Sequence, residues 1–256
     1  MATEMKDIKL VVRDLSLHYG TFQALASINL GIPSGAATAV IGRTGAGKSS
    51  LLRSLCRMNE LWDDVRTEGQ VLLDGKSIYE PGIDVTEVRR RVGLLARSPI
   101  PFPKSIFDNI AYGPRLHGIR QRGDLDDAVK RSLKQVGLWN EVKDKLNSSA
   151  LELSPGQKAR LCIARAVAVQ PEVLLIDDPA TNLDPVSTAK IEDLILELKE
   201  HYTIVVATHN MQQAGRVSDY VAFLSQGSLV EFGPTSDVFA RPKDKRTEDY
   251  ITGRYN

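Results

Sequence analysis

Residues 42–49 read Gly-Arg-Thr-Gly-Ala-Gly-Lys-Ser and directly follow the apolar run 37–41. A buried strand, a glycine-rich loop and a helix start, in this order, are typical of a backbone that binds the phosphates of a nucleotide. Lys48 would reach the outer phosphates, and the hydroxyl of Ser49 would bind Mg²⁺. An ordinary glycine-rich turn would not need a lysine and a serine directly after its last glycine. We therefore predict a nucleoside triphosphate site. Its predicted contacts are Gly42, Arg43, Thr44, Gly45, Ala46, Gly47, Lys48, Ser49 and Ser50.

Two carboxylates follow a second apolar run, 173–176. Asp177 ends that run, and Asp178 comes next, before Pro179 and the sequence Asn-Leu-Asp-Pro at 182–185. In phosphate-loop ATPases an aspartate at such a strand end stands beside the loop hydroxyl and holds Mg²⁺. An acid at the end of a strand is common, so Asp177 alone is weak evidence, and the residues that follow it strengthen the prediction.

Three further residues have both a structural and a functional explanation. Ser154 and Pro155 fit an ordinary capped helix start, with serine as N-cap and proline at the first helical position. His209 follows the apolar run 203–208 and could be a surface residue. Tyr19, which precedes Gly20 in an expected hairpin, could be a plain core or edge tyrosine.

The elements that must position these residues alternate between strands and helices. Short apolar runs separated by helices predict a parallel sheet covered on both faces. Strands are expected at 8–19, 24–32, 68–74, 92–96, 173–177 and 203–208, with a hairpin of 220–224 and 228–232 around Gln226 and Gly227. Helices are expected from the phosphate loop to about Met58, and at 124–136, 155–169 and 185–199. The stretch from about 98 to 165 has helical periodicity without a clear strand, which indicates a helical insert.

Composition excludes several other classes. The net charge of +1 provides no polybasic field for nucleic acid or anionic lipid. No stretch approaches about 18 consecutive apolar residues, so no membrane span is expected. The 4 histidines are scattered and indicate no metal cluster. Cys56 and Cys162 each lie in an expected helix, which favours buried reduced thiols over a disulfide.

Over nearly its whole length the sequence resembles the ATP-binding cassette (ABC) family. The resemblance rests on the phosphate loop, the Leu-Ser-Pro-Gly-Gln segment at 153–157, Asp177 with Asp178, and Thr208 with His209. Further segments are most similar to the ATPase subunit of bacterial phosphate importers. They are 52–53, 57–59, 101–103, 105–106, 138–146, 161–165, 208–213 and 247–255.

The resemblance implies an α/β phosphate-loop NTPase fold with a mixed sheet core, an antiparallel β subdomain and an inserted helical subdomain. Residues 1–97 and 166–256 would form the ATP-binding core and 98–165 the helical signature subdomain. It also implies that Asp178 and His209 act with Lys48 in catalysis and that Tyr19 stacks on adenine. The remaining implied nucleotide contacts are Arg97, Ser154, Gly156, Gln157 and Asp184, and the implied Mg²⁺ ligands are Ser49 and Asp177.

The same resemblance implies partners and a location. Two copies would pack head to tail, so that Ser154 of one copy meets the ATP bound by the other. Two integral membrane permease subunits would dock near residues 100–107, and a phosphate-binding protein would supply the solute indirectly. The chain would sit peripherally on the cytoplasmic face of the inner membrane, with ATP and Mg²⁺ as ligands and no nucleic acid.

Three residues depart from the family pattern at catalytic positions: Arg97 replaces a glutamine, Asp178 a glutamate and Pro155 a glycine. Proline suits a first helical turn, so the change at Pro155 is mild. The shorter Asp178 withdraws its carboxylate by roughly 1.5 Å, which predicts slowed rather than absent hydrolysis. Arg97 could stabilise charge on the γ-phosphate, repel Mg²⁺, or point to solvent or to an acidic groove of a partner.

Three functions remain open at this point. The leading one is an ATPase that powers the import of inorganic phosphate. The second is a binding switch or regulatory subunit that closes on ATP but scarcely hydrolyses it, which Arg97 and Asp178 motivate. The third, an ABC ATPase of DNA repair, is disfavoured because the chain has no long coiled-coil or zinc-bearing insertion.

Overall fold

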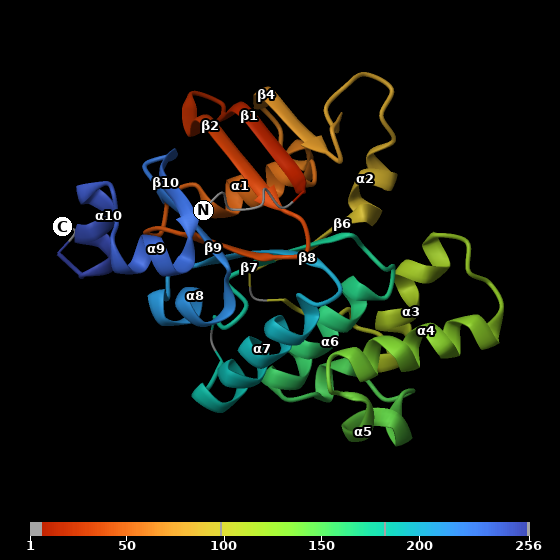
Figure 1. The fold of residues 1–256 in the computed structure, drawn as a ribbon. Coiled ribbons are helices and arrows are strands. Elements are labelled where there is room, and N and C mark those ends of the chain that lie inside the picture. Colours follow the sequence, from red (N-terminus) through yellow and green to blue (C-terminus); the bar gives the residue numbers. More distant parts are fainter. Residues whose placement is uncertain (1–6, 98, 182, 255–256) are drawn as a thin grey trace.

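The computed structural model describes residues 7–97, 99–181 and 183–254. Ser98, Asn182 and Tyr255, which belong to segments named above, lie outside these ranges. The described chain contains a 6-stranded sheet in the order β10-β9-β3-β8-β7-β6 and a 4-stranded sheet in the order β2-β1-β4-β5. Figure 1 shows the smaller sheet at the top of the molecule and the helices α3 to α6 at the lower right.

The strands of the smaller sheet precede those of the larger sheet in the chain, except that β3 of the larger sheet follows β2. Those of the larger sheet are β3 (Ala37–Ile41), β6 (Val92–Leu95), β7 (Val173–Asp177), β8 (Thr203–Thr208), β9 (Tyr220–Ser225) and β10 (Ser228–Pro234). Those of the smaller sheet are β1 (Ile8–Tyr19), β2 (Phe22–Pro33), β4 (Val65–Leu73) and β5 (Lys76–Ser77). The predicted mixed core sheet and antiparallel β subdomain are thus confirmed.

The centre of the larger sheet is parallel because its strands are apolar on both faces. Every residue of β3, β7 and β8 is buried. β3 pairs in parallel with β8 and β9, β8 with β7, and β7 with β6, whereas β10 is antiparallel to β9. The carboxyl ends of the adjacent strands β3, β8, β7 and β6 therefore meet at one edge, which is where ligands bind in open α/β sheets.

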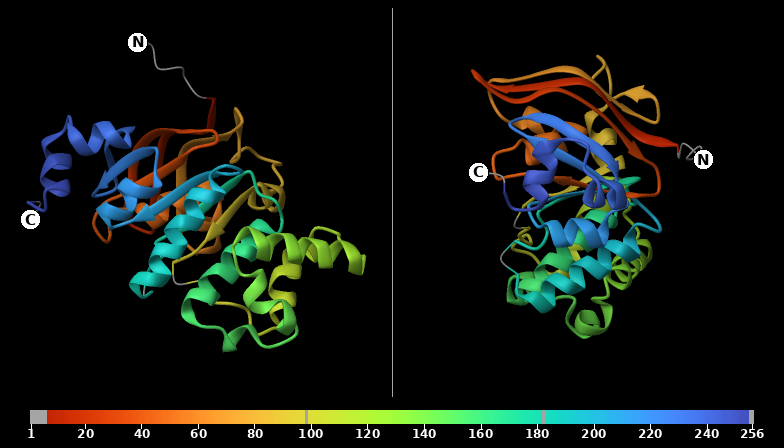
Figure 2. Two further views of the ribbon diagram at one scale, coloured as in Figure 1. Left: turned by 60° about the horizontal axis from the view of Figure 1, so that its bottom comes forward. Right: turned by 60° about the vertical axis from the view of Figure 1, so that its left-hand side comes forward.

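Alternate residues of each central strand face opposite layers. On β7, Leu174 and Ile176 pack into the cluster formed by the helices below the sheet. Val173 and Leu175 pack into the cluster formed with the smaller sheet and α1. The larger sheet is therefore covered on both faces, as expected, by helices on one side and mainly by the small sheet and α1 on the other (Figure 2).

Ten α-helices lie in the described ranges. They are α1 (Lys48–Leu55), α2 (Val85–Arg91), α3 (Ile106–Leu116), α4 (Arg122–Gln135), α5 (Trp139–Val142), α6 (Pro155–Val167), α7 (Pro185–Leu198), α8 (Met211–Val217), α9 (Thr235–Ala240) and α10 (Lys245–Ile251). Short 3₁₀ helices occur at Met58–Leu61, Lys143–Lys145 and Ala150–Glu152. None of the helices in this part of the chain is long and apolar enough to cross a membrane.

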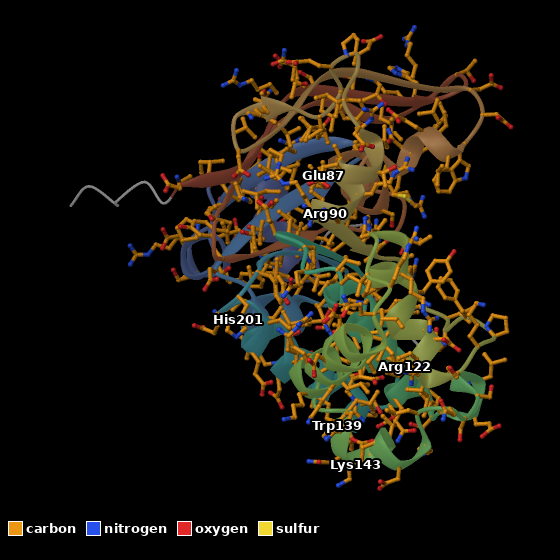
Figure 3. The ribbon with its side chains drawn as sticks, turned by 90° about the vertical axis from the view of Figure 1, so that its right-hand side faces the viewer. Glu87, Arg90, Arg122, Trp139, Lys143 and His201 are labelled. Carbon is orange, nitrogen blue, oxygen red and sulfur yellow. The ribbon has the colours of Figure 1, made fainter. Side chains whose placement is uncertain are left out.

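The helices α3 to α6, called the helical unit below, pack as the sequence pattern predicts. On α4 the residues Leu125, Val129 and Leu133 recur at helical spacing and are buried in one cluster with α3 and α6. The guanidinium of Arg122 lies 4.1 Å from the centre of the Phe107 ring and so links α4 to α3. Figure 3 labels Arg122 among the side chains of the helical unit. α6 continues to Val167, through the predicted domain boundary at 165, so the helical unit and the core share this helix.

Several predicted bounds differ from the structure. The helix after the phosphate loop ends at Leu55 rather than near Met58, and β4 begins earlier than expected, at Val65. The hairpin around Gln226 and Gly227 is confirmed, but it is followed by two helices, α9 and α10. Both cysteines are buried and free, as predicted.

Candidate functional site

The loop between β3 and α1 adopts a shape that requires glycine. Gly42 and Gly47 have φ of 150° and 101°, a region that L side chains rarely adopt. A Cβ on Gly42 would lie 2.3 Å from the carbonyl oxygen of Leu224, and one on Gly47 would lie 2.9 Å from that of Ala24. Glycine is therefore needed at these positions for two reasons: the positive φ angles that curl the loop, and the close approach of the loop to neighbouring strands. Such a curled loop before a helix fits a phosphate chain.

Lys48 begins α1 and turns back over the loop. Its ammonium donates hydrogen bonds to the carbonyl oxygens of Gly42, at 2.6 Å, and Arg43, at 2.9 Å. Burial lowers the pKa of Lys48 below its ordinary value, while the carboxylates of Asp178 and Asp177 oppose that shift. A partly buried cation beside the loop complements the negative charge of a polyphosphate.

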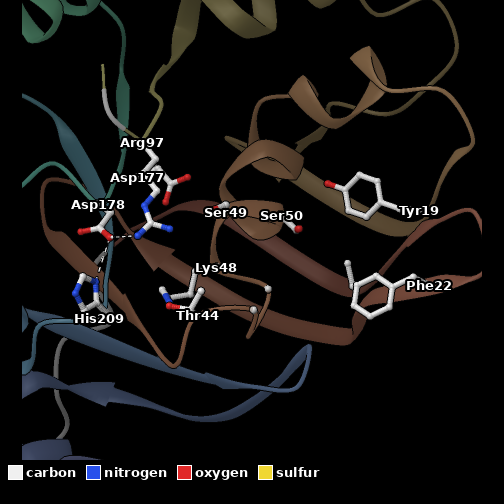
Figure 4. Close-up of a pocket in the computed structure, with 13 residues that line it drawn as sticks. Tyr19, Phe22, Thr44, Lys48, Ser49, Ser50, Arg97, Asp177, Asp178 and His209 are labelled. Carbon is white, nitrogen blue, oxygen red and sulfur yellow. Dashed lines mark hydrogen bonds and ion pairs between the residues drawn. The ribbon is translucent and has the colours of Figure 1, made fainter. Parts of the chain in front are cut away.

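A cavity of about 240 Å³ opens beside Lys48. Its lining residues are Tyr19, Phe22, Ala24, Thr44, Gly45, Gly47, Lys48, Ser49, Ser50, Arg97, Asp177, Asp178 and His209. Figure 4 shows Arg97, Asp178 and His209 at one end, the two aromatic rings at the other, and Lys48 between them. The charged end, with Lys48 beside it, suits the phosphates of a nucleotide, and the aromatic end suits its base.

Two side chains, those of Arg97 and His209, contact the same carboxylate oxygen of Asp178. Its Oδ2 lies 3.3 Å from a guanidinium nitrogen of Arg97 and 3.1 Å from Nδ1 of His209. The backbone of Asp178 has a φ of 50°, and its N–H donates to the carbonyl oxygen of Ala207 on β8. The backbone of Asp178 is thus held by β8, and its carboxylate is held by Arg97 and His209. The carboxylate faces the cavity (Figure 4).

Ser49 and Asp177 are the residues that could hold Mg²⁺. Both line the cavity, and Asp177 is only 5% exposed. No group of 3 or more His, Cys, Asp or Glu side chains that could hold a metal occurs in the described residues. Mg²⁺ usually takes one or two protein ligands and completes its shell with phosphate oxygens and water, so one hydroxyl and one carboxylate fit it.

The other predicted contacts lie outside this cavity. Gly42, Arg43 and Ala46 are not among its lining residues, and Arg43 and Ala46 line a neighbouring cavity instead. Ser154 caps α6: its Oγ accepts from the N–H of Gln157, and Gln157 Oε1 accepts from the N–H of Ser154.

Two more predicted contacts pack beside the start of α7. Asp184 caps this helix by accepting from the N–H groups of Val186 and Ser187. A Cβ on Gly156 would lie 2.6 Å from Ser187 Oγ, so Gly156 packs closely against the same helix start. Neither residue lines the cavity beside Lys48.

Sequence reasoning missed Phe22. Its side chain is 65% exposed and lines the cavity, whereas Tyr19 is partly buried and packs against the core cluster of the small sheet. The buried hydroxyl of Tyr19 has no hydrogen-bond partner among the described residues. An aromatic residue placed directly after the turn that follows Tyr19 was the available signal, because the two positions bracket a short hairpin.

Comparison with known proteins identifies the family. The family model of the ABC transporter matches residues 25–181. Among solved structures, cbiO1 from Clostridium perfringens, part of the ABC transporter complex cbiONQ, shares 27% identity over 97% of both chains, with a TM-score of 0.80. An ATP-bound bacterial Atm1-family ABC exporter shares 24% identity over 96% of this chain and 42% of its own, with a TM-score of 0.78. The ATP-binding cassette MJ0796, in a dimeric post-hydrolysis state with ADP and Pi, shares 24% identity over 88% of this chain and 98% of its own, with a TM-score of 0.76. The chain belongs to the ABC transporter family, as an ATP-binding domain.

Proposed function

We propose that the chain hydrolyses ATP and thereby energises the import of inorganic phosphate through an ABC transporter. The observation that carries the ATPase assignment is the single cavity that brings Lys48, Ser49, Asp177, Asp178 and His209 together. The assignment to phosphate rests on the resemblance of segments such as 138–146 and 247–255 to phosphate-importer ATPases.

Each residue of the cavity has its own proposed role in phosphoryl transfer. Lys48 exchanges its bonds to the loop carbonyls for phosphate oxygens. Ser49 and Asp177 would hold Mg²⁺, which would supply positive charge to neutralise the phosphates. Asp178 orients the attacking water and accepts its proton, and His209 holds the Asp178 carboxylate in place. Because Asp178 already lies 3.1 Å from His209, little rearrangement of this pair is needed.

The site is proposed to be completed by a second copy. Ser154, Gly156 and Gln157 stand at the start of a capped helix outside the cavity of their own chain. A helix start favours a negative charge through its N–H groups and dipole. In a head-to-tail dimer this start faces the γ-phosphate bound by Lys48 of the partner, and closure moves the helical unit 98–165 relative to the core.

Two permease subunits are proposed to dock near residues 100–107. The side chain of Ile100 is 72% exposed, and a cavity of about 410 Å³ next to it is lined by Leu94, Pro99 and Arg165 among others. An apolar side chain at the rim of a groove suits a protein partner. This docking places the chain at the cytoplasmic face of the inner membrane, with a phosphate-binding protein supplying the solute on the other side.

Steady-state turnover tests the proposal. The purified chain with ATP and Mg²⁺ is expected to release phosphate, and Lys48→Ala is expected to abolish that release. Reconstitution with the permease subunits and the phosphate-binding protein should couple turnover to uptake of labelled phosphate. Background turnover even with these partners present would overturn the ATPase assignment, and uptake of a different solute would overturn the phosphate assignment.

A second function is favoured by the contact between Arg97 and Asp178. With one carboxylate oxygen engaged by a guanidinium, Asp178 has fewer free positions for an attacking water, which suits a subunit that closes on ATP and scarcely hydrolyses it. Such a switch would bind ATP tightly, dimerise and turn over slowly. Variants of these two residues distinguish it from an ATPase.

A further inference from the structure

A carboxylate on α5 contacts the beginning of α6. Oε1 of Glu141 accepts a hydrogen bond from Arg160 Nη1 at 2.8 Å, and its Oε2 accepts from Arg160 Nη2 at 3.0 Å. The same Oε2 accepts from Nε2 of Gln157 at 2.8 Å. Figure 1 shows α5 at the lower end of the helical unit. Glu141 therefore connects α5 with two side chains near the start of α6.

Gln157 links Glu141 to the residue that caps α6. Both ends of the Gln157 amide are bonded, because Nε2 donates to Glu141 and Oε1 accepts from the backbone N–H of Ser154 at 3.1 Å. An ionised carboxylate only accepts hydrogen bonds, so it selects the orientation in which Nε2 faces Glu141. The opposite orientation would place the amide NH₂ against the N–H of Ser154, donor against donor. Glu141 thus favours the orientation in which the capping box of α6 forms.

Arg160 keeps Glu141 charged and in place. Its guanidinium also donates to the carbonyl oxygen of Gly137 at 3.0 Å, which ties it to the segment between α4 and α5. The Arg160 side chain is only 10% exposed, and its hydrogen bonds lower the pKa of Glu141. Glu141 is therefore a fixed acceptor at neutral pH, and the charge of its carboxylate is balanced by the guanidinium.

The first turn of α6 has few donors for an anion. Pro155, at the first helical position, has no N–H, and the N–H of Gln157 donates to Ser154 Oγ at 3.3 Å. The N–H of Gly156 and the hydroxyl hydrogen of Ser154 are left to meet a phosphate. The capping box sets the direction of both groups, so a helix start without it would present fewer well-directed donors.

We propose that Glu141 is a positioning residue for the nucleotide site that a second copy completes: its carboxylate orients the Gln157 amide, and the amide holds the first turn of α6 in the shape that meets the partner's triphosphate. This inference rests on the proposed head-to-tail dimer. It assigns a role to a residue of the segment 138–146, whose residue types alone suggest no chemistry. Glu141 does not line the cavity beside Lys48 of its own chain, so its effect is on the nucleotide bound by the other copy.

The test is dimerisation of the full chain with Mg²⁺ and the non-hydrolysable β,γ-imido analogue of ATP, followed by analytical ultracentrifugation. Glu141→Gln removes the charge that orients the amide. We expect it to weaken analogue-dependent dimerisation by about threefold to tenfold, the effect of losing one hydrogen bond. Affinity for the analogue, measured at protein concentrations too low for dimers, should stay within about twofold of wild type, because the cavity beside Lys48 is unchanged.

Gln157→Met shows whether Glu141 acts through the amide. This variant keeps the ion pair of Glu141 with Arg160 and removes the link to Ser154. It should weaken dimerisation at least as much as Glu141→Gln does. Because the two side chains act through one contact, the double variant should dimerise like Gln157→Met alone. A further loss in the double variant would overturn the proposed route through the amide.

Glu152→Gln is the matched control for charge. Glu152 is exposed and lies two residues before Ser154, so this change also removes a negative charge near the start of α6. Loss of charge alone reduces the repulsion of a phosphate and should leave dimerisation unchanged or tighten it in both variants. Loss of positioning weakens dimerisation in Glu141→Gln only. Tighter dimerisation of Glu141→Gln would therefore overturn the inference.

The same measurements separate failure of the inference from failure of the proposed function. If the wild type dimerises and Glu141→Gln dimerises as tightly, the positioning role is wrong and the dimer stands, even if the thermal midpoint falls. If Glu141→Gln does not fold, Gln157→Met decides, and its unchanged dimerisation would overturn the inference. If the wild type binds the analogue but stays monomeric, the head-to-tail dimer is wrong and the inference with it. If the wild type binds no analogue, the nucleotide site is wrong as well.

Discussion

The guanidinium of Arg97 and the carboxylate of Asp178 form an ion pair at 3.3 Å at one end of the proposed nucleotide cavity. These are two of the three positions at which the sequence departs from the family pattern. Of the alternatives left open for Arg97, the contact disfavours a side chain directed only at solvent. The Arg97 side chain is 48% exposed, so an incoming phosphate can compete for it.

Truncation of Asp178 tests its role as the base. Asp178→Ala is expected to lower kcat by about 10²-fold to 10⁴-fold, the usual contribution of a general base, while ATP still binds through the loop. Asp126→Ala on the exposed face of α4 is the control and should leave turnover unchanged. Phosphate release and ATP affinity are measured for all three proteins, and a kcat within about twofold of wild type for Asp178→Ala would remove this residue from the mechanism.

A double-mutant cycle of Arg97→Gln and Asp178→Glu measures whether the pair acts as a unit. Because the two side chains touch, their effects on kcat should be non-additive by about twofold to 100-fold. For an ATPase the double variant turns over moderately faster than wild type. A steep rise, from background to a typical rate of about 10 s⁻¹, indicates that the natural chain is a switch. An unchanged rate means that the two departures do not suppress hydrolysis.

The aromatic end of the cavity should contribute to binding of the base. Phe22→Ala is expected to weaken ATP binding by about tenfold, because stacking of a base on an aromatic ring contributes roughly 1–3 kcal/mol. Binding of tripolyphosphate, which has no base, should not change. Tyr19→Phe is the control, since its hydroxyl has no hydrogen-bond partner among the described residues. Equal losses for ATP and tripolyphosphate would mean that Phe22 acts through the loop and not through adenine.

An ion-pair network far from the cavity predicts how stability depends on pH. Glu172 accepts from Arg91 and Lys9, and these bonds lower its pKa from 4.5 to about 2. A lowered folded-state pKa stabilises the protein above pH 4.5, and that contribution is lost as the pH falls from 4.5 towards 2. The Glu172 side chain is 38% exposed, so solvent screening limits the contribution to about 1 kcal/mol.

Urea unfolding of Glu172→Gln checks this value. At pH 7 the variant should be less stable than wild type by about 1 kcal/mol, and the difference should shrink between pH 4 and pH 2. Asp126 is exposed and pairs only within its own helix, so Asp126→Asn serves as the control and should differ little at any pH. A difference that stays constant down to pH 2 would show that Glu172 stabilises the fold by packing and not by charge.

The parts of the fold that could be predicted are those where the residue types are compatible with only one kind of secondary structure. β3, β7 and β8 are short, mostly apolar and buried throughout, and the glycine loop after β3 is typical of phosphate binding, so the core and the phosphate site follow from the pattern. The short helices α2, α8, α9 and α10 have 6 or 7 residues and no extended apolar periodicity, and their helical form depends on tertiary packing and caps.

Contacts between distant residues could not be predicted from one sequence. The pairing of Arg97 with Asp178 depends on β6 and β7 being neighbours, and the stacking of Tyr250 on Phe223 depends on where α10 folds back. The role of Phe22 was missed because a hairpin position shows no chemistry until its side chain is known to face a cavity. Residue types predicted the chemistry, and only strand order and packing determined which residues meet.

Four neighbouring parallel strands end at the same edge and deliver Gly42, His209, Asp177 and Arg97 to it. The spacing between these groups is therefore fixed by backbone hydrogen bonds of the most deeply buried part of the molecule. Heating should not erode ATP affinity gradually, as it would for a binding site built on mobile loops. Affinity should instead disappear in the same cooperative step as the central sheet, so that hydrogen exchange of β3 and β8 amides and loss of nucleotide share one midpoint.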